Sequence, residues 1–337
     1  MSYDGRLLAL ARARFERAKE QHEGEFREKK EALYRKLPRL GEIDRALRGT
    51  MTQVIAASLR HGKDPKAAIE ALKQQNLALH DERAALLKSA GLPEDALEYR
   101  PLCAVCSDSG YRKDGSMCDC LKAFYVLEQN RELSKMLNIG AQSFDTFQMD
   151  YYSQEPWKQY GGMSPYENMD LIRETCYRYA RNFGPKSGSL FLTGTPGLGK
   201  TFLSACIARE VSERGFSVVY DTATHVFSQF ETNKFRRGGE EEQEEAAADV
   251  KRYLNCDLLI VDDLGTELVT PFVQDVLYQL INSRMVSDKK TIISSNLTEG
   301  EIRKRYSPQI ASRLSGEYRQ LSFFGDDIRK IKQRRGF

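Results

Sequence analysis

The segment from Gly194 to Thr201 reads G-T-P-G-L-G-K-T and fills the pattern G-x-x-x-x-G-K-[ST], which binds nucleotide phosphates. Glycines let backbone N–H groups turn toward phosphate oxygens, and the following helix adds the positive end of its dipole. In this pattern Lys200 reaches the β- and γ-phosphates, and the Thr201 hydroxyl binds Mg²⁺. An apolar strand precedes the motif, which favours this interpretation over a glycine-rich turn that binds nothing. The predicted nucleotide-binding residues of the loop are Gly194, Thr195, Pro196, Gly197, Leu198, Gly199, Lys200 and Thr201.

A second acidic element follows at Asp257–Asp263, where an apolar run, L-L-I-V, ends in two carboxylates. A carboxylate at the carboxyl end of such a strand can hold Mg²⁺ beside a triphosphate, and we assign this role to Asp262. Asp263 would then polarise the attacking water. Taken alone, the pattern also fits a buried strand that ends in a capping aspartate. Together with the phosphate loop, it predicts a site for ATP and Mg²⁺.

Four cysteines lie close together at Cys103, Cys106, Cys118 and Cys120, in the spacing C-x₂-C, eleven residues, then C-x-C. Four thiolates can close a tetrahedral Zn²⁺ site, and a closed ligand set indicates a structural metal because no coordination position stays open. Free thiols and an iron–sulfur cluster remain alternatives on ligand spacing alone. The other three cysteines lie in apolar patterns and are expected in the core.

The net charge is +3, from 51 basic and 48 acidic residues, so bulk charge gives no argument for nucleic acid. A local patch at 234–237, K-F-R-R, combines cations with an aromatic ring and could follow a phosphate backbone and stack a base. A second basic patch occupies 329–335. A solvated loop is an equally compatible interpretation of either patch.

These residues must be positioned by a scaffold, and short apolar runs alternating with helical patterns indicate which one. Such runs are typical of a parallel sheet covered on both faces, which predicts an α/β domain over 143–337. An aromatic, irregular segment at 143–162 and a helix over 164–183 come before the first run. The predicted strands are 189–193, 217–220, 257–262, 291–295 and 320–324.

The front of the chain has a different sequence pattern. Residues 1–92 carry apolar residues at helical spacing among many charges, which predicts a small helical bundle or hairpin that binds a partner. Residues 93–142 are predicted to form the cysteine module and a linker helix. The sequence has neither a secretory signal nor an apolar run of the roughly 18–20 residues that a membrane span needs, so we expect a cytoplasmic protein with no membrane partner.

Several motifs resemble a known family. The phosphate loop, the acidic strand and the polar end of the fourth strand resemble the core of AAA+ ATPases, which implies a P-loop AAA+ domain with a five-stranded parallel sheet. Asp262–Gly265, Ser295–Leu297 and Ser312–Leu314 look like the DnaC/DnaI helicase loaders and the related IstB transposition ATPases. The cysteine cluster is similar to the module ahead of the ATPase domain in DnaI-type and phage-type loaders.

The resemblance also implies roles for single residues. Asn296 matches the sensor-1 position, which orients water or the γ-phosphate. Arg313 matches the arginine finger that one subunit offers to its neighbour, and Arg329 matches a sensor-2-like position. Asp263 stands where many related ATPases have glutamate, and its shorter side chain leaves more room to the water.

The family implies an ATP-dependent loader that binds the hexameric replicative helicase and helps place it on single-stranded DNA. Self-association on ATP binding and slow ATP hydrolysis, modulated by a partner or by single-stranded DNA, are expected with it. Two alternatives remain open at this point. One is an IstB-like ATPase that assists a transposase, and the other is a nucleotide-gated adaptor with little hydrolysis.

Overall fold

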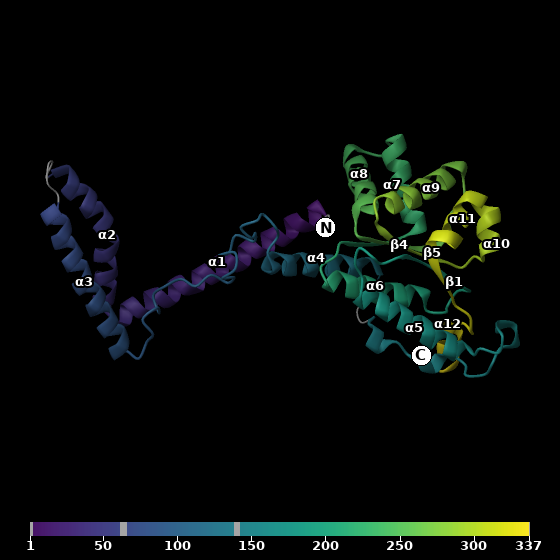
Figure 1. Cartoon of the computed structure of the whole chain (residues 1–337), viewed down its shortest axis with the longest axis horizontal. Coiled ribbons are helices and arrows are strands. Elements are labelled where there is room, and N and C mark those ends of the chain that lie inside the picture. The colour runs from purple at the N-terminus through teal and green to yellow at the C-terminus, as the bar shows by residue number, and fades with distance from the viewer. Residues whose placement is uncertain (1–2, 61–65, 138–141, 337) are drawn as a thin grey trace. The chain divides into compact units, whose positions relative to one another are not determined.

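The computed structural model describes residues 3–60, 66–137 and 142–336 (Figure 1). The chain divides into two compact units. One comprises Met1–Arg12 together with Leu121–Phe337, and the other comprises Ala13–Cys120. Among the described residues, no helix combines the length and the apolar character needed to cross a membrane.

The larger unit is built on a five-stranded sheet with strand order β2-β3-β4-β1-β5, and all of its strand pairs are parallel. This confirms the α/β fold that the alternating apolar runs predicted. The fifth strand begins and ends two residues earlier than expected, because Phe323 and Phe324, whose apolar side chains suggested strand residues, lie just after its end. The strands are β1 (Ser189–Thr193), β2 (Val218–Thr222), β3 (Leu258–Leu264), β4 (Lys290–Ser295) and β5 (Tyr318–Ser322).

Alternate residues of each strand enter two separate cores. Leu190, Leu192 and Ile260 pack on one face against the helices over 165–181 and 200–213, whereas Phe191 and Val261 pack on the other face against the helices that lie between 223 and 317. Burial of each such side chain stabilises the fold by about 1.5–3 kcal/mol. This two-sided burial explains why the strands read as continuous apolar runs.

Helix starts in this unit follow from capping residues and prolines. Ser164 caps α5, and it exchanges hydrogen bonds with Glu167 in a capping box, with Pro165 at the first helical position. Thr270 and Ser307 cap α9 and α11, each again before a proline. The helices are α4 (Asp119–Leu137), α5 (Pro165–Arg181), α6 (Lys200–Glu213), α7 (Ala223–Phe235), α8 (Glu240–Asn255), α9 (Pro271–Val286), α10 (Glu299–Arg305), α11 (Pro308–Glu317) and α12 (Ile328–Arg334), with 3₁₀ turns at Phe144–Thr146, Met149–Tyr151 and Lys158–Tyr160.

The smaller unit is helical up to the cysteine module, as the sequence predicted. It contains most of α1 (Gly5–Lys36), followed by α2 (Pro38–Arg60) and α3 (Lys66–Ser89), which lie side by side as a hairpin (Figure 1). The buried carboxylate of Asp44 on α2 joins the three helices. It accepts a hydrogen bond from the Tyr34 hydroxyl on α1 and pairs with Lys30 Nζ on α1 at 3.1 Å and Arg83 Nε on α3 at 3.6 Å.

Candidate nucleotide-binding site

The phosphate loop connects the carboxyl end of β1 to the first turn of α6, as its sequence pattern requires. Gly194, Gly197 and Gly199 all have positive φ angles, of 142°, 81° and 93°. A Cβ at Gly194 would lie 2.2 Å from the backbone oxygen of Phe323, so only glycine fits beside the segment that follows β5.

Lys200 is the best-connected side chain of the loop and is only 5% exposed. Its Nζ donates to the carbonyl oxygens of Gly194 at 2.6 Å and Thr195 at 2.9 Å, and to Asn296 Oδ1 at 2.7 Å. Burial lowers the pKa of Lys200 to about 8, although the carboxylates of Asp262 and Asp263 act in the opposite direction. A phosphate group placed here would favour the charged ammonium.

Asp262 lies at the carboxyl end of β3 and is 4% exposed. Its Oδ2 accepts hydrogen bonds from Thr201 Oγ1 at 2.9 Å and from the Tyr220 hydroxyl at 2.6 Å, and its Oδ1 accepts one from the Ser294 hydroxyl. Burial and the Asp262 charge raise the pKa of Tyr220 well above its ordinary value, so this hydroxyl stays a donor. The contacts bring Asp262 and Thr201, the two predicted Mg²⁺ ligands, into direct contact.

Asp263 has a positive φ of 56°, a left-handed conformation that costs a residue other than glycine about 1–2 kcal/mol. Its N–H donates to Ser294 Oγ at 3.0 Å, and its carbonyl accepts from Thr266 Oγ1 at 3.0 Å. Burial and the Asp262 charge raise the pKa of its carboxyl group. A raised pKa makes the carboxylate a better proton acceptor, which suits a group that activates water.

One pocket of about 340 Å³ joins these groups. Asp263, Asn296 and Arg329 line it together with the phosphate loop, so the structure brings these sequence-predicted residues to one place. Arg313 does not line it. Arg313 lies on α11, where its guanidinium stacks 5.3 Å from the ring centre of Tyr278.

The pocket also has a wall that sequence reasoning left without a role. Phe147, Tyr151 and Tyr152 line it from the irregular segment before α5, and Lys332 lines it from α12. The Tyr152 hydroxyl donates to the Leu198 carbonyl at 3.1 Å, and Lys332 Nζ lies 5.2 Å from the ring centre of Tyr151. The many aromatic residues of this segment were visible in the sequence, but their spacing did not indicate that they line a binding site.

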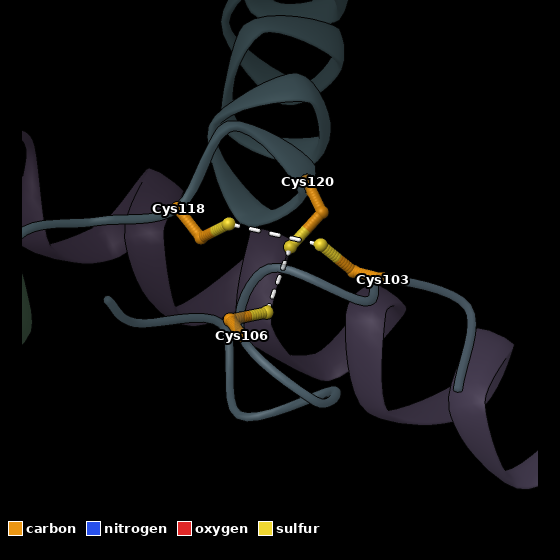
Figure 2. A group of neighbouring side chains, drawn as sticks. All are labelled: Cys103, Cys106, Cys118 and Cys120. Atoms are coloured by element: carbon orange, nitrogen blue, oxygen red, sulfur yellow. Dashed lines mark hydrogen bonds between the residues drawn. The ribbon is translucent and has the colours of Figure 1, made fainter. Parts of the chain in front are cut away.

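The four cysteines of the front module converge (Figure 2). Their sulfur atoms lie within 4.8 Å of one another, with Cys103 and Cys118 3.8 Å apart and Cys106 and Cys120 3.4 Å apart. Four sulfurs around Zn²⁺ at about 2.3 Å would stand about 3.8 Å from each other in a tetrahedron, so the cluster is compatible with zinc. Burial and the neighbouring thiols raise the pKa of Cys120, and a cation among the sulfurs would remove that cost of ionisation.

A buried carboxylate supports the turn that carries the first cysteine pair. Asp108 is 3% exposed and has a φ of 58°. It accepts hydrogen bonds from the N–H groups of Cys103 at 2.8 Å and Leu102 at 3.0 Å, and from the Tyr99 hydroxyl at 3.1 Å. These bonds fix the backbone that leads into the first cysteine pair.

The basic and aromatic patch lies at the end of α7. Phe235 is 52% exposed and packs 5.3 Å from Phe272, between ring centres. Lys234 Nζ lies 5.0 Å from the Phe272 ring centre, and the Arg237 guanidinium lies 5.6 Å from that of Phe235. The structure thus presents an aromatic face together with cations at this surface.

Residues 180–313 match the family described as IstB-like ATP binding protein. The match includes the phosphate loop, both carboxylates at the end of β3, Asn296 and Arg313.

Part of the chain is homologous to the replicative helicase loader DnaC. DnaC of Escherichia coli (strain K12) is 28% identical over 137 residues, which are 41% of this chain and 54% of DnaC. DnaC of Buchnera aphidicola subsp. Baizongia pistaciae (strain Bp) is 26% identical over 153 residues, 45% of this chain and 61% of DnaC. The chain therefore spans about half the length of the curated relatives it matches. These matches confirm the resemblance to DnaC-type loaders and IstB-like ATPases.

Two solved structures resemble part of the chain. The crystal structure of the DnaC helicase loader has a TM-score of 0.44 and 19% identity, and the match covers 56% of this chain and 99% of that one. The crystal structure of DnaI has a TM-score of 0.41 and 20% identity, with coverage of 47% and 86%.

Proposed function

We propose that this chain is an ATP-dependent loader that binds the hexameric replicative helicase and helps place it on single-stranded DNA. One observation carries the proposal: in a chain that is partly homologous to DnaC, Asp263, Asn296 and Arg329 line one pocket together with the phosphate loop, and Asp262 accepts a hydrogen bond from Thr201 of that loop. The homology supports the loader role, and the pocket supports ATP as the nucleotide that the loader hydrolyses.

The side chains of the pocket have distinct roles in ATP hydrolysis. Lys200 would bind the β- and γ-phosphates, and Thr201 and Asp262 would hold Mg²⁺, which neutralises charge on the transferred phosphoryl group when bound. Asp263 would take the proton of the attacking water, and Asn296, which reaches Lys200 Nζ at 2.7 Å, would orient the γ-phosphate or the water. Arg329 would add charge to the phosphate side of the pocket. The aromatic wall suits the flat face of a nucleobase.

In this proposal Arg313 acts in the pocket of a neighbouring copy, since it is not among the residues that line the pocket of its own chain. Self-association on ATP binding would complete the site, and turnover of the isolated chain would be slow. A phosphate-release assay tests this with and without a single-stranded oligonucleotide. Stimulated release that is absent in Lys200→Ala supports an ATPase, whereas nucleotide binding without turnover under either condition supports the nucleotide-gated adaptor.

We assign the remaining parts of the chain to partners. Residues 1–92 would bind the helicase, residues 93–142 would form the zinc module and linker, and residues 143–337 would form the AAA+ ATPase domain. Capture with the tagged full-length chain separates the candidate functions: a hexameric helicase supports the loader, and a transposase supports the IstB-like alternative that the family match also favours.

The patch at the end of α7 would contact single-stranded DNA through its exposed ring and its cations. Replacing Lys234 and Arg236 by alanine should weaken binding of an oligothymidine and make its affinity less dependent on salt. Fluorescence anisotropy over a salt series measures both quantities. Replacing Arg178 and Arg209, which form ion pairs within α5 and α6, gives a control of equal charge. Equal binding by both variants would exclude the patch.

A further inference from the structure

A buried glutamate follows the Asp262–Asp263 pair and has no role in the chemistry assigned above. Glu267 is 6% exposed. Its Oε2 accepts the N–H of Gly265 at 3.0 Å, and its Oε1 accepts the hydroxyl of Tyr306. Its backbone carbonyl accepts Arg305 Nη2 at 2.8 Å. Burying a carboxylate costs free energy unless hydrogen bonds compensate for the lost water. The specific donors around Glu267 therefore suggest that the buried carboxylate has a function.

One end of this arrangement is the turn that orients Asp263. The left-handed conformation of Asp263 is maintained by hydrogen bonds to Ser294 and Thr266. Gly265, two residues further on, has a φ of 108°, and a Cβ there would lie 2.7 Å from Leu297. The turn is therefore closely packed, and the bond from Gly265 to the Glu267 carboxylate joins any movement of the turn to Glu267.

The other end is the junction between α10 and α11. Tyr306 is buried and caps α10, with its N–H donating to the Ile302 carbonyl. Ser307 then caps α11, the helix that carries Arg313. The glutamate carboxylate thus bonds on one side to the turn after Asp263 and on the other to the base of the helix that presents the arginine.

We propose that Glu267 is a positioning residue that couples Asp263, in the pocket of one subunit, to Arg313, which the same subunit offers to its neighbour. The inference rests on the proposed function, in which that arginine acts in the neighbouring site. A shift of the turn when Asp263 engages water and phosphate moves the Gly265 N–H, and Glu267 transmits the movement to Tyr306 and α11. Each subunit would then present its arginine in accordance with the state of its own pocket.

The test is a subunit-mixing assay of phosphate release with the full-length chain. Asp263→Asn chains still bind nucleotide but cannot take the proton of the attacking water, so they can donate the arginine from an occupied subunit, and Arg313→Ala chains have a working pocket but cannot donate. Mixing them should restore turnover that neither shows alone. Glu267→Gln is then added to one partner at a time, because glutamine has nearly the same volume but its amide cannot accept both bonds.

The proposal expects turnover of the mixture to fall about tenfold, equivalent to about 1.4 kcal/mol, with Glu267→Gln in either partner. Affinity for a fluorescent ATP analogue and the melting temperature should stay close to those of the parent chains, which a merely structural role would not allow. Glu317→Gln, an exposed substitution on α11, is the matched control and should change nothing.

If turnover falls with Glu267→Gln in only one of the two partners, the coupling is overturned, because Glu267 then serves one site alone. Unchanged turnover with the substitution in either partner would overturn it as well. If the mixture recovers no turnover although the wild-type chain is active, the neighbouring arginine is wrong and this inference fails with it. If the wild-type chain releases no phosphate, the proposed ATPase itself fails. Should Glu267→Gln melt early, Tyr306→Phe removes only the α11 side, and unchanged turnover with this variant in the donor would overturn the coupling.

Discussion

The lysine of the phosphate loop gives the sharpest quantitative prediction. Burial lowers the pKa of Lys200 to about 8 before nucleotide binds, and a triphosphate favours only the charged ammonium. At about pH 7 some nine-tenths of the chains carry this charge, and at about pH 9 only about one-tenth do. If binding requires the charge, affinity for ATP should fall roughly tenfold over this interval.

Titration of a fluorescent ATP analogue at constant Mg²⁺ and ionic strength measures the effect. Lys200→Arg is the control, because a guanidinium stays charged throughout the interval and its affinity, whatever its absolute value, should not change with pH. An affinity of the wild-type chain that is constant between these pH values would refute the reasoning. The same slope in Lys200→Arg would refute it too, since the titrating group would then lie elsewhere.

The same lowered pKa has a consequence for stability of opposite sign. Between about pH 8 and the ordinary lysine value of 10.5, the unfolded chain binds more protons than the folded one. The contribution of Lys200 to the free energy of unfolding therefore rises with pH across this window.

Three further predictions concern separate parts of the chain. Tyr220→Phe removes one of the donors to Asp262, which should cost about 0.5–1.5 kcal/mol of carboxylate positioning and raise the Mg²⁺ concentration needed for half-maximal turnover by about threefold to tenfold; an unchanged Mg²⁺ titration would contradict this. Asp44→Asn should lower the free energy of unfolding by about 3 kcal/mol, measured by urea denaturation followed by helical circular dichroism. Burial alone would raise the pKa of Asp44, but the Tyr34 hydroxyl and Lys30 lower it below the ordinary 3.8, so this contribution is present above about pH 4, is lost as pH falls through the lowered pKa, and should show no such loss in the variant. Cys103→Ser should abolish stoichiometric zinc, measured by elemental analysis of the purified chain, whereas zinc retained at the wild-type level would exclude the cluster as its site.

The sequence was sufficient for the parts of the site that depend on local pattern. The phosphate loop, the acidic end of β3 and the cysteine spacing each need a fixed order of residue types, and each lies in the predicted element. Parallel strands bring their carboxyl ends to one edge of a sheet, so the meeting of Asp262, Asn296 and the loop followed from the fold class.

Other parts of the site depend on contacts between distant segments, which no local pattern encodes. In the sequence, Tyr220 resembles the other apolar residues of its strand. Its hydroxyl reaches Asp262 only because β2 pairs with β3. Tyr151 and Lys332 are far apart in the chain, and only the return of α12 over the loop makes them neighbours. Glu267 was hidden for the same reason, because its partner Tyr306 lies 39 residues further along the chain, at the end of α10.

β4 lies between β1 and β3, so a shift of this strand would affect the contacts on both of its sides. Two side chains at its carboxyl end reach opposite ways, Ser294 to Asp262 and Asn296 to Lys200. Sliding this central strand by one residue would change both positions at once: in one direction Ile293 would replace Ser294, in the other Leu297 would replace Asn296, and Ser295 would take the remaining position. The position of β4 therefore sets the geometry of both the cation site and the phosphate site. A substitution within the strand that displaces one of these sites should also displace the other.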